Sequence, residues 1–449
     1  MILGLVQNPP HSSRPSNKAQ NKHFMKDRFR VLLIASNYFF PPTDGTTLRD
    51  YNMFSRFSGD FEFDLLTFGD EKLLRDHKNL ARPLGTCFRG VRILSVSSLR
   101  SIKLTRGVSR FTNIFFPKKL TMGLPRYSNE MANVVRQMID SPDYDLIYFC
   151  DFSVYCHSDG SIGQRPYIVD IQDSPTVLFD SKVRNQRTAK QKVRAYLNLL
   201  WARRYERTYF SKIKNMIFVS ELDRAYVQKR CRQSNIWVVP NGVDIDYFKP
   251  KDKRSGMGNR LLFTGVMDYH PNHEAMVYFI REILPVVRSK VRDVSLTIAG
   301  KNPMPELQEL ASRTPDVKLT GFVKDMRPYF DDADVYISPL ISGAGIKNKI
   351  LEAWAMAKPA VASTVSCSGL EVRDGENIIL ADGTKRFSEE IVRLLKNGQL
   401  QSKLAREGRK TAEESYSWKR RAYELESVCV EVMKGRDSKR LMKAENCSP

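Results

Sequence analysis

Short apolar runs that alternate with helical segments constrain the fold of this chain most strongly. The runs are continuous rather than alternating, which is typical of parallel strands buried on both faces of a sheet. The predicted strands cover 28–36, 61–68, 144–150, 167–171, 216–220, 236–240, 261–265, 294–299, 317–321, 335–338 and 360–362. Because a strand, a glycine-containing loop and a helix follow one another, we expect an α/β fold of doubly wound sheets. Ligands of such sheets bind at the carboxyl ends of the strands.

The length of 449 residues allows two such domains. A tight turn at 241–244 ends the first series of strands, and the Lys- and Gly-rich stretch 249–259 has the composition of a linker. We therefore predict domains at 28–244 and 245–415. A last helix, interrupted near 416–418, is expected to pack back on the first domain over 416–435. Residues 1–27 are predicted to be a disordered extension, in which Met25 is an alternative start, and 436–449 a flexible tail.

The net charge is +22 and the sequence pI is about 9.6. This balance predicts an anionic partner, which could be nucleic acid, an acidic membrane surface or a phosphorylated small molecule. No apolar run approaches the roughly 20 residues of a membrane-spanning helix. The 7 cysteines show neither a CxxC pair nor Cys/His spacing, which argues against a disulfide framework and a zinc site. We expect a reducing, cytoplasmic location.

Two segments carry much of the positive charge. Basic residues alternate with aromatic and aliphatic ones over 94–122, which fits an anionic bilayer, a nucleic-acid strand or a helix that buries its aromatic side. Residues 180–214 hold eleven Lys/Arg against two acids, Asp180 and Glu206. A solvated basic helix and a surface that contacts a phosphate-bearing acceptor or a membrane are both consistent with this second segment.

A glycine-rich loop opens a helix at 343–352 and is followed by a buried strand. Free N–H groups and the positive end of the helix dipole favour an anion there. Lys347 and Lys349 add positive charge where helix stability alone favours Asp or Glu, and Glu352 projects from the same face as Lys349. We interpret the stretch as a nucleotide-sugar site. The acidic run 331–334 is expected to end a helix and enter a strand, so no metal site is assigned.

Several motifs resemble glycosyltransferase family 4. Residues 238–248 resemble its Pro-Asn-Gly-Val-Asp signature with a following Phe, and 263–272, 317–323 and 345–353 are similar to a branch of sugar transferases from bacterial exopolysaccharide clusters. The resemblance covers about 28–435 and is most specific in the second half. It implies the GT-B architecture, in which two Rossmann-like domains face a central cleft.

The resemblance also implies roles for individual residues. Glu352 matches the second Glu of the family's E-x7-E motif, which binds the ribose, whereas the first Glu is replaced by Ala344. This departure removes the carboxylate that would contact the donor sugar. Lys349 and Glu352 are the expected catalytic residues, with Lys349 neutralising the diphosphate. The further positions implied to bind the donor are Gly45, Lys301, Gly321, Val323 and Gly345.

The implied reaction is retaining transfer from a UDP- or GDP-sugar to a lipid-linked or polysaccharide acceptor. Helix N-termini and lysines would stabilise the leaving diphosphate, so we expect neither a metal nor another cofactor. Asp151, His157 and Asp173, near strand ends, are the acceptor-side candidates, with capping as the alternative role of each Asp.

We expect a cytoplasmic enzyme, peripheral at the inner face of an anionic membrane. Nucleic acid is a less favoured partner because the sequence has no recognisable RRM or zinc-finger motif. A second hypothesis is a non-catalytic GT-B relative that acts as a scaffold in polysaccharide assembly, for which Ala344 is the main argument.

Overall fold

The computed structural model describes residues 28–42, 44–70, 73, 81–96, 128–158, 162–185, 188–251, 258–343 and 345–445. The predicted extension 1–27, most of the basic segment 94–122 and Ala344 lie outside these residues. The chain divides into two compact units, Met1–Tyr148 with Ser153–Pro166, and Phe149–Phe152 with Tyr167–Pro449. The domain boundary at 244 stays a prediction.

In the first unit, β1 (Phe29–Ala35), β2 (Phe61–Gly69) and β3 (Phe88–Ser95) pair in parallel in the order β3-β2-β1. Residues 31–35 of β1 are buried, as the continuous apolar run predicts. Helix α1 (Gly45–Phe54) follows β1 and begins with a capping box between Asp44 and Thr47. The following part of the chain forms α4 (Asn129–Asp140), β4 (Leu146–Phe149) and α5 (Phe152–Tyr155), and short 3-10 helices lie at Arg82–Leu84 and Cys156–Ser158.

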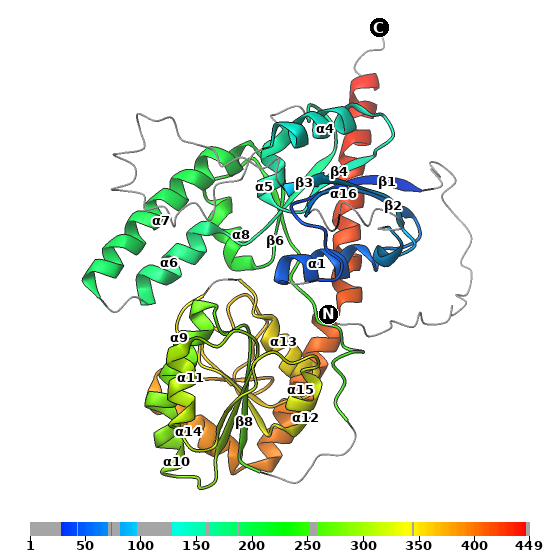
Figure 1. Ribbon diagram of the computed structural model, residues 1–449. Helices are drawn as coiled ribbons and strands as arrows, with labels where there is room; N and C mark the ends of the chain where they lie inside the picture. Colours follow the sequence, from blue (N-terminus) through cyan, green and yellow to red (C-terminus); the bar gives the residue numbers. More distant parts are fainter. Residues whose placement is uncertain are drawn as a thin grey trace. The chain divides into compact units, whose positions relative to one another are not determined.

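The second unit begins with three parallel strands in the order β5 (Tyr167–Gln172), β6 (Asn215–Phe218) and β7 (Asn235–Val238). Helices α6 (Pro175–Asn185) and α7 (Ala189–Tyr209) connect β5 to β6, and α8 (Glu221–Gln228) connects β6 to β7. Figure 1 shows α6 and α7 side by side as a helix pair, in agreement with their contacts.

A second parallel sheet has the order β10-β9-β8-β11-β12-β13. Its strands are β8 (Arg260–Thr264), β9 (Ser295–Ala299), β10 (Val317–Leu319), β11 (Val335–Ser338), β12 (Ala360–Ala362) and β13 (Ile379–Leu380). From β8 the chain adds β9 and β10 toward one edge of the sheet, and from β11 it adds β12 and β13 toward the other edge. The order therefore reverses between β8 and β11, and the carboxyl ends of these strands are the expected binding edge.

Helices cover both faces of this sheet (Figure 1). Leu261 and Phe263 of β8 join the core under α9 (His270–Tyr278), α10 (Leu284–Arg288) and α14 (Thr384–Leu395). The intervening Leu262 joins a second core under α12 (Arg327–Asp332) and α13 (Asn348–Ala355). The remaining helices are α11 (Pro305–Ser312), α15 (Gly398–Ser415) and α16 (Trp418–Glu445). The α/β fold with parallel sheets is thus confirmed.

The structure changes two local predictions. The amphipathic pattern over 272–291 predicts one continuous α-helix; in the structure the helical segment starts at His270 and contains a π-helical stretch, Phe279–Ile283. The last helix is interrupted before Trp418 as expected, but α16 continues to Glu445, so most of the predicted tail is helical. Trp237 of β7 donates a hydrogen bond to Glu431 of α16 at 3.2 Å.

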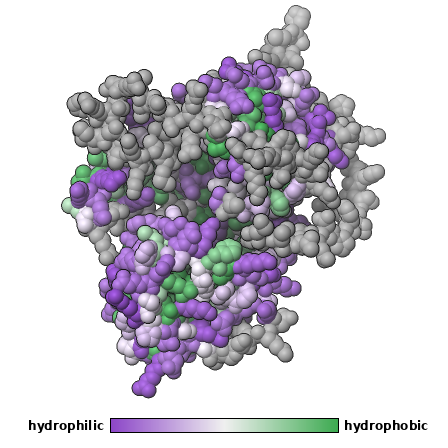
Figure 2. Space-filling view, in the orientation of Figure 1, coloured by the Kyte–Doolittle hydropathy of each residue, from purple (hydrophilic) through white to green (hydrophobic). Residues whose placement is uncertain are grey.

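Hydrophilic residues cover most of the surface over α10 and α11 in the view of Figure 2. Among the residues that the structure describes, no helix has both the length and the apolar character needed to cross a membrane.

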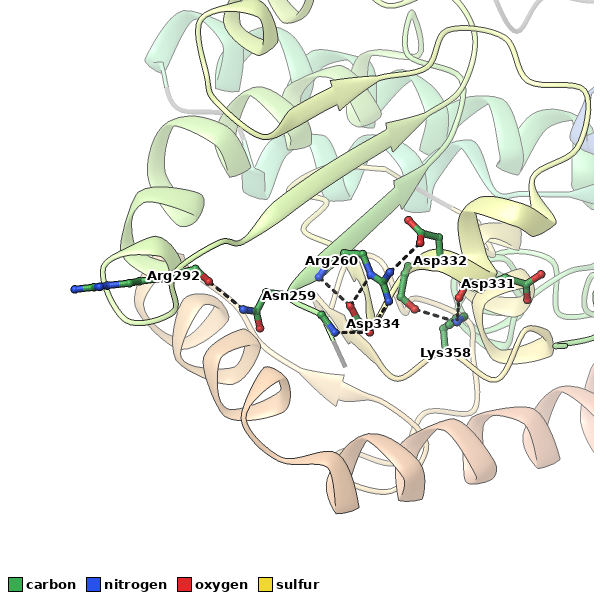
Figure 3. A network of polar contacts seen from close by, with 9 residues as sticks. Asn259, Arg260, Arg292, Asp331, Asp332, Asp334 and Lys358 are labelled. Atoms are coloured by element: carbon green, nitrogen blue, oxygen red, sulfur yellow. Dashed lines mark hydrogen bonds and ion pairs between the residues drawn. The ribbon is translucent and has the colours of Figure 1, made fainter. Parts of the chain in front are cut away.

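The acidic run 331–334 ends α12 and leads into β11, as predicted (Figure 3). Asp334 forms an ion pair with Arg260 at 3.0 Å, and Asp332 contacts the same guanidinium at 3.0 Å. Lys358 lies beside them and donates to the backbone oxygens of Asp331 and Ala333 at 3.1 and 2.9 Å. Its ammonium group therefore caps the carbonyl end of α12.

Replacing the buried Lys358 by methionine should lower the free energy of unfolding by about 1–3 kcal/mol, because the two carbonyl oxygens lose their donor. Urea denaturation followed by circular dichroism measures this change. Lys396→Met is the matched control, since Lys396 is exposed, and should change the stability by less than about 0.5 kcal/mol. Equal effects of the two substitutions would contradict the capping role.

Candidate functional site

The carboxyl ends of β8 and β9 approach each other closely through two glycines. Gly265 follows β8, and its N–H donates to the backbone oxygen of Ala299 at 3.0 Å. Gly300 follows β9 with a φ of +152°, and a Cβ added there would lie 1.7 Å from the oxygen of Gly265. Only glycine fits this close backbone contact. Neither residue places a side chain at the binding edge of the sheet, so a ligand can approach the backbone there.

Helix α13 points its N-terminus toward this edge from the loop that follows β11. The loop contains Gly343 and Gly345 with φ values of +135° and +71°. Lys347 is the N-cap residue and makes no side-chain capping bond, and the first turn contains no acid. In the described structure, the positive end of α13 thus lacks the side-chain acceptor that normally caps a helix. This arrangement suits an anion.

Lys349 lies in the first turn of α13 and is partly buried. Its Nζ donates to Oδ1 of Asn272 at 2.6 Å and lies 4.2 Å from the ring centroid of Phe263. Burial lowers the pKa of Lys349 to about 7, and the nearby charge of Lys347 acts in the same direction. No ion pair with a described residue balances this ammonium group. A bound anion would therefore stabilise its charged form.

Glu352 lies one turn further along the same helix face. Burial raises the pKa of its carboxyl group to about 7, although the charge of Lys349 opposes this shift. Nearby, the hydroxyl groups of Tyr336 and Thr264 are 3.0 Å apart and satisfy each other. Within the described part of the chain, the Glu352 carboxylate has no hydrogen-bond partner, so it is available to accept from a ligand hydroxyl.

The sequence did not identify Asn272, which shapes the site. Asn272 also donates from Nδ2 to the oxygen of Val266 at 2.8 Å, which fixes the amide so that Oδ1 faces Lys349. Asn272 lies in the 263–272 stretch quoted for the family resemblance, which is the signal that could have identified it. Lys347 was identified from the sequence, but its burial was not: it is only 8% exposed and donates to the oxygen of Gly345 at 2.7 Å.

Asp173 follows β5 and lies beside the loop that opens α13. A Cβ added at Gly345 would lie 2.5 Å from Oδ1 of Asp173. Burial lowers the pKa of Lys347 to about 8, while the charges of Asp173 and Asp223 oppose this shift. The structure thus brings together Asp173, Gly345 and Lys347 at one end of the loop.

The other residues predicted to bind the donor differ in how exposed they are. Lys301 is exposed, and its backbone oxygen accepts from the N–H of Met267 at 2.8 Å. Gly321 has a φ of +68° with open space around it, and Val323 is partly buried. Their roles toward a ligand stay predictions.

Gly45 and His157 belong to the first unit. Gly45 starts α1, and no described atom lies within 4 Å of where a Cβ would stand. His157 is buried, with the N–H of Ser128 donating to Nε2 at 3.0 Å and Nδ1 lying 3.3 Å from the oxygen of Val154. Both ring nitrogens therefore contact backbone atoms, which favours a structural role.

Asp151 is partly exposed just after β4. No cluster of His, Cys, Asp or Glu able to hold a metal occurs among the described residues.

Comparisons with known proteins identify similar sequences and folds. Residues 258–397 match the family model "Glycosyl transferases group 1". The chain is 20% identical to an uncharacterized 44.6 kDa protein in the cps region of Klebsiella pneumoniae, over 59% of this chain and 68% of that protein. It is 29% identical to the phosphatidyl-myo-inositol mannosyltransferase of Mycobacterium leprae, over 47% of this chain and 58% of the relative. The Mycobacterium tuberculosis mannosyltransferase is 31% identical over 38% of this chain and 46% of the relative. The chain thus spans about half the length of these mannosyltransferases.

Solved structures share the fold at low sequence identity. Anabaena Alr3699/HepE in complex with UDP superposes with a TM-score of 0.62 at 14% identity, over 90% of this chain and 100% of that chain. Sucrose-phosphate synthase from Thermosynechococcus elongatus gives 0.64 at 16% identity, over 91% and 100%. The chain therefore has the GT-B fold, and its residues 258–397 are similar to the glycosyltransferase group 1 family.

Proposed function

We propose that this protein is a retaining, metal-independent glycosyltransferase of family 4 that acts in cell-surface glycan synthesis. Its donor is a UDP- or GDP-sugar, and its acceptor is lipid-linked or a polysaccharide. The observation that carries this proposal is the pair Lys349 and Glu352 at the uncapped N-terminus of α13, on the binding edge of the second sheet. The domain match at 258–397 and the neighbouring structure with bound UDP support it.

In the proposed reaction the donor diphosphate lies at the N-terminus of α13. Lys349 stabilises the negative charge that develops on the leaving diphosphate, and the backbone N–H groups of the first turn act in the same sense. The leaving phosphate accepts the acceptor's hydroxyl proton, so the step needs no separate base. Glu352 in its ionised form accepts hydrogen bonds from the ribose hydroxyls.

The proposed acceptor side centres on Asp173. Its exposed carboxylate lies against Gly345, whereas both nitrogens of His157 already contact backbone atoms. We propose that Asp173 accepts a hydrogen bond from the acceptor hydroxyl. Ala344 stands where the family's motif has its first Glu, so this chain lacks the carboxylate that would contact the donor sugar. Other groups must therefore hold the sugar.

A panel of UDP- and GDP-sugars tests the proposal. The full-length protein is incubated with each donor and a lipid-linked or polysaccharide acceptor, and the released nucleoside diphosphate and the anomeric configuration of the product are measured. Release that depends on the acceptor, with retention, supports a retaining transferase. Tight donor binding without any release would instead favour the non-catalytic relative.

The affinity for UDP or GDP is expected to fall as the pH rises from 7 to 9. Because burial lowers the pKa of Lys349 to about 7 in the free protein, the lysine loses its charge in this range, and binding must then recover the proton. The decrease should approach about tenfold per pH unit. At pH 8 Glu352, whose pKa is about 7, is mostly ionised already, so net proton uptake is predicted. Calorimetry in buffers of different ionisation enthalpy measures this uptake; net proton release at pH 8 would contradict it.

A further inference from the structure

Helix α7 has apolar side chains on two opposite faces. Its buried face includes Ala195, Leu199 and Ala202, which pack inside the second unit. The opposite face exposes Val193, Tyr196, Leu197 and Leu200, with exposed fractions of 60%, 50%, 44% and 44%. These four residues follow the i, i+3, i+4, i+7 spacing of one helix face. An apolar stripe of this kind on a charged protein indicates a contact surface.

The same face turns strongly basic toward the end of the helix. Arg204 and Arg207 lie one and two turns beyond Leu200, and both are exposed. Together with the loop between α8 and β7 they line a cavity of about 1000 Å³. Its charged lining residues are Arg203, Arg204, Arg207, Lys229, Arg230 and Arg232.

These cations are almost without counter-charges. No carboxylate lines the cavity, and among the described residues only Arg230 approaches an acid, with NH1 3.7 Å from Oε2 of Glu206. Nε of Arg203 is buried and has no hydrogen-bond partner in the described structure. Because like charges so close together repel one another, the arrangement favours a bound anion.

The cavity is distinct from the nucleotide edge. Helix α7 ends just before β6 begins, and the loop after α8 leads directly into β7. The cavity therefore lies at the amino ends of these strands, whereas Asp173 follows the carboxyl end of β5. In a parallel arrangement these are opposite edges.

We propose that the exposed face of α7 binds an anionic membrane surface, with a lipid phosphate headgroup in the basic cavity and the apolar stripe against the acyl chains. A basic cavity beside an aliphatic stripe matches the two layers of such a surface. A second copy of this chain is disfavoured because it would bring two basic cavities together. A nucleic-acid strand is disfavoured because three of the four stripe residues are aliphatic and offer no ring for base stacking. The proposal does not depend on sugar transfer.

Sedimentation with vesicles tests this surface. The full-length protein is mixed with vesicles of phosphatidylcholine alone or with an equimolar amount of phosphatidic acid, and the bound fraction is measured against lipid concentration. We expect binding only to the vesicles with phosphatidic acid. The double substitution Arg204→Glu/Arg207→Glu should weaken it at least about 30-fold, since each basic residue at such a surface contributes about fivefold.

The matched control is Lys290→Glu/Arg292→Glu, which changes the net charge equally at exposed positions before β9 and should bind nearly as the wild type. Leu197→Ser/Leu200→Ser tests the apolar half and should also weaken binding to the vesicles. Equal losses in the Arg204/Arg207 and Lys290/Arg292 variants would overturn the proposal. So would binding of a single-stranded RNA oligonucleotide, but not of vesicles, that depends on Arg204 and Arg207. Binding of soluble glycerol 3-phosphate in the cavity, without any binding to vesicles, would contradict the proposal that the bound phosphate belongs to a membrane lipid.

Discussion

Replacing Lys349 by methionine is expected to lower the rate of sugar transfer about 10²–10³-fold, the usual effect of removing one group that stabilises a leaving charge. Lys349 is partly buried in the first turn of α13, and no described ion pair engages its ammonium group, although the charge of Glu352 acts on it. Steady-state release of UDP or GDP from the active donor measures the effect. Methionine keeps the length and apolar stem of the side chain, so its packing against Phe263 is retained.

The control for this substitution is Lys396→Met, an exposed lysine at the end of α14 that should leave the rate unchanged. Thermal unfolding of both variants without ligand separates a folding defect from a catalytic one. A Lys349→Met variant that folds normally and transfers sugar at the wild-type rate would show that the diphosphate is stabilised elsewhere.

Gly300→Ala is expected to be the most disruptive single methyl addition at the binding edge. The new Cβ would lie 1.7 Å from the backbone oxygen of Gly265, so the ends of β8 and β9 must separate. Together with the φ of +152°, this overlap should lower the free energy of unfolding by about 3 kcal/mol or more. Urea denaturation measures the stability, and thermal shift with UDP or GDP measures the accompanying loss of nucleotide binding.

Gly375→Ala separates the two causes. Gly375 also has a positive φ, +73°, but no described atom lies within 4 Å of its added Cβ. The free energy of unfolding of Gly375→Ala should therefore fall by only about 1 kcal/mol, which is the cost of the positive φ alone. Equal losses at Gly300 and Gly375 would mean that the close approach of the strand ends contributes nothing.

The strands were the most predictable part of the fold. Runs such as 31–35 are buried on both faces of a parallel sheet, so continuous hydrophobicity alone identifies them. Helix ends were less predictable. Lys347, expected in the first turn of its helix, is instead the N-cap residue, and α13 begins at Asn348 after a loop in which Gly343 and Gly345 adopt positive φ values. The π-helical stretch Phe279–Ile283 between α9 and α10 was not predicted either, because its hydrogen-bond pattern leaves no distinct signal in the local sequence.

The candidate site could be located from the sequence, but its electrostatics could not. The glycines and lysines of 343–352 indicate an anion site because local helix chemistry alone requires it. The burial of Lys347 and the contact of Lys349 with Asn272 depend on residues distant in the chain, which local patterns do not report. The same holds for His157, whose Nε2 accepts a hydrogen bond from the N–H of Ser128, a residue distant in the chain.

Calorimetric titration of the wild type and Lys349→Met with UDP and GDP at pH 7 tests the central claim most directly. If α13 and Lys349 form a nucleoside-diphosphate site, the wild type binds at least one of the two nucleotides saturably at one site per chain, and the variant loses this binding. Undiminished binding by Lys349→Met, or no binding of either nucleotide by the wild type, would contradict the claim.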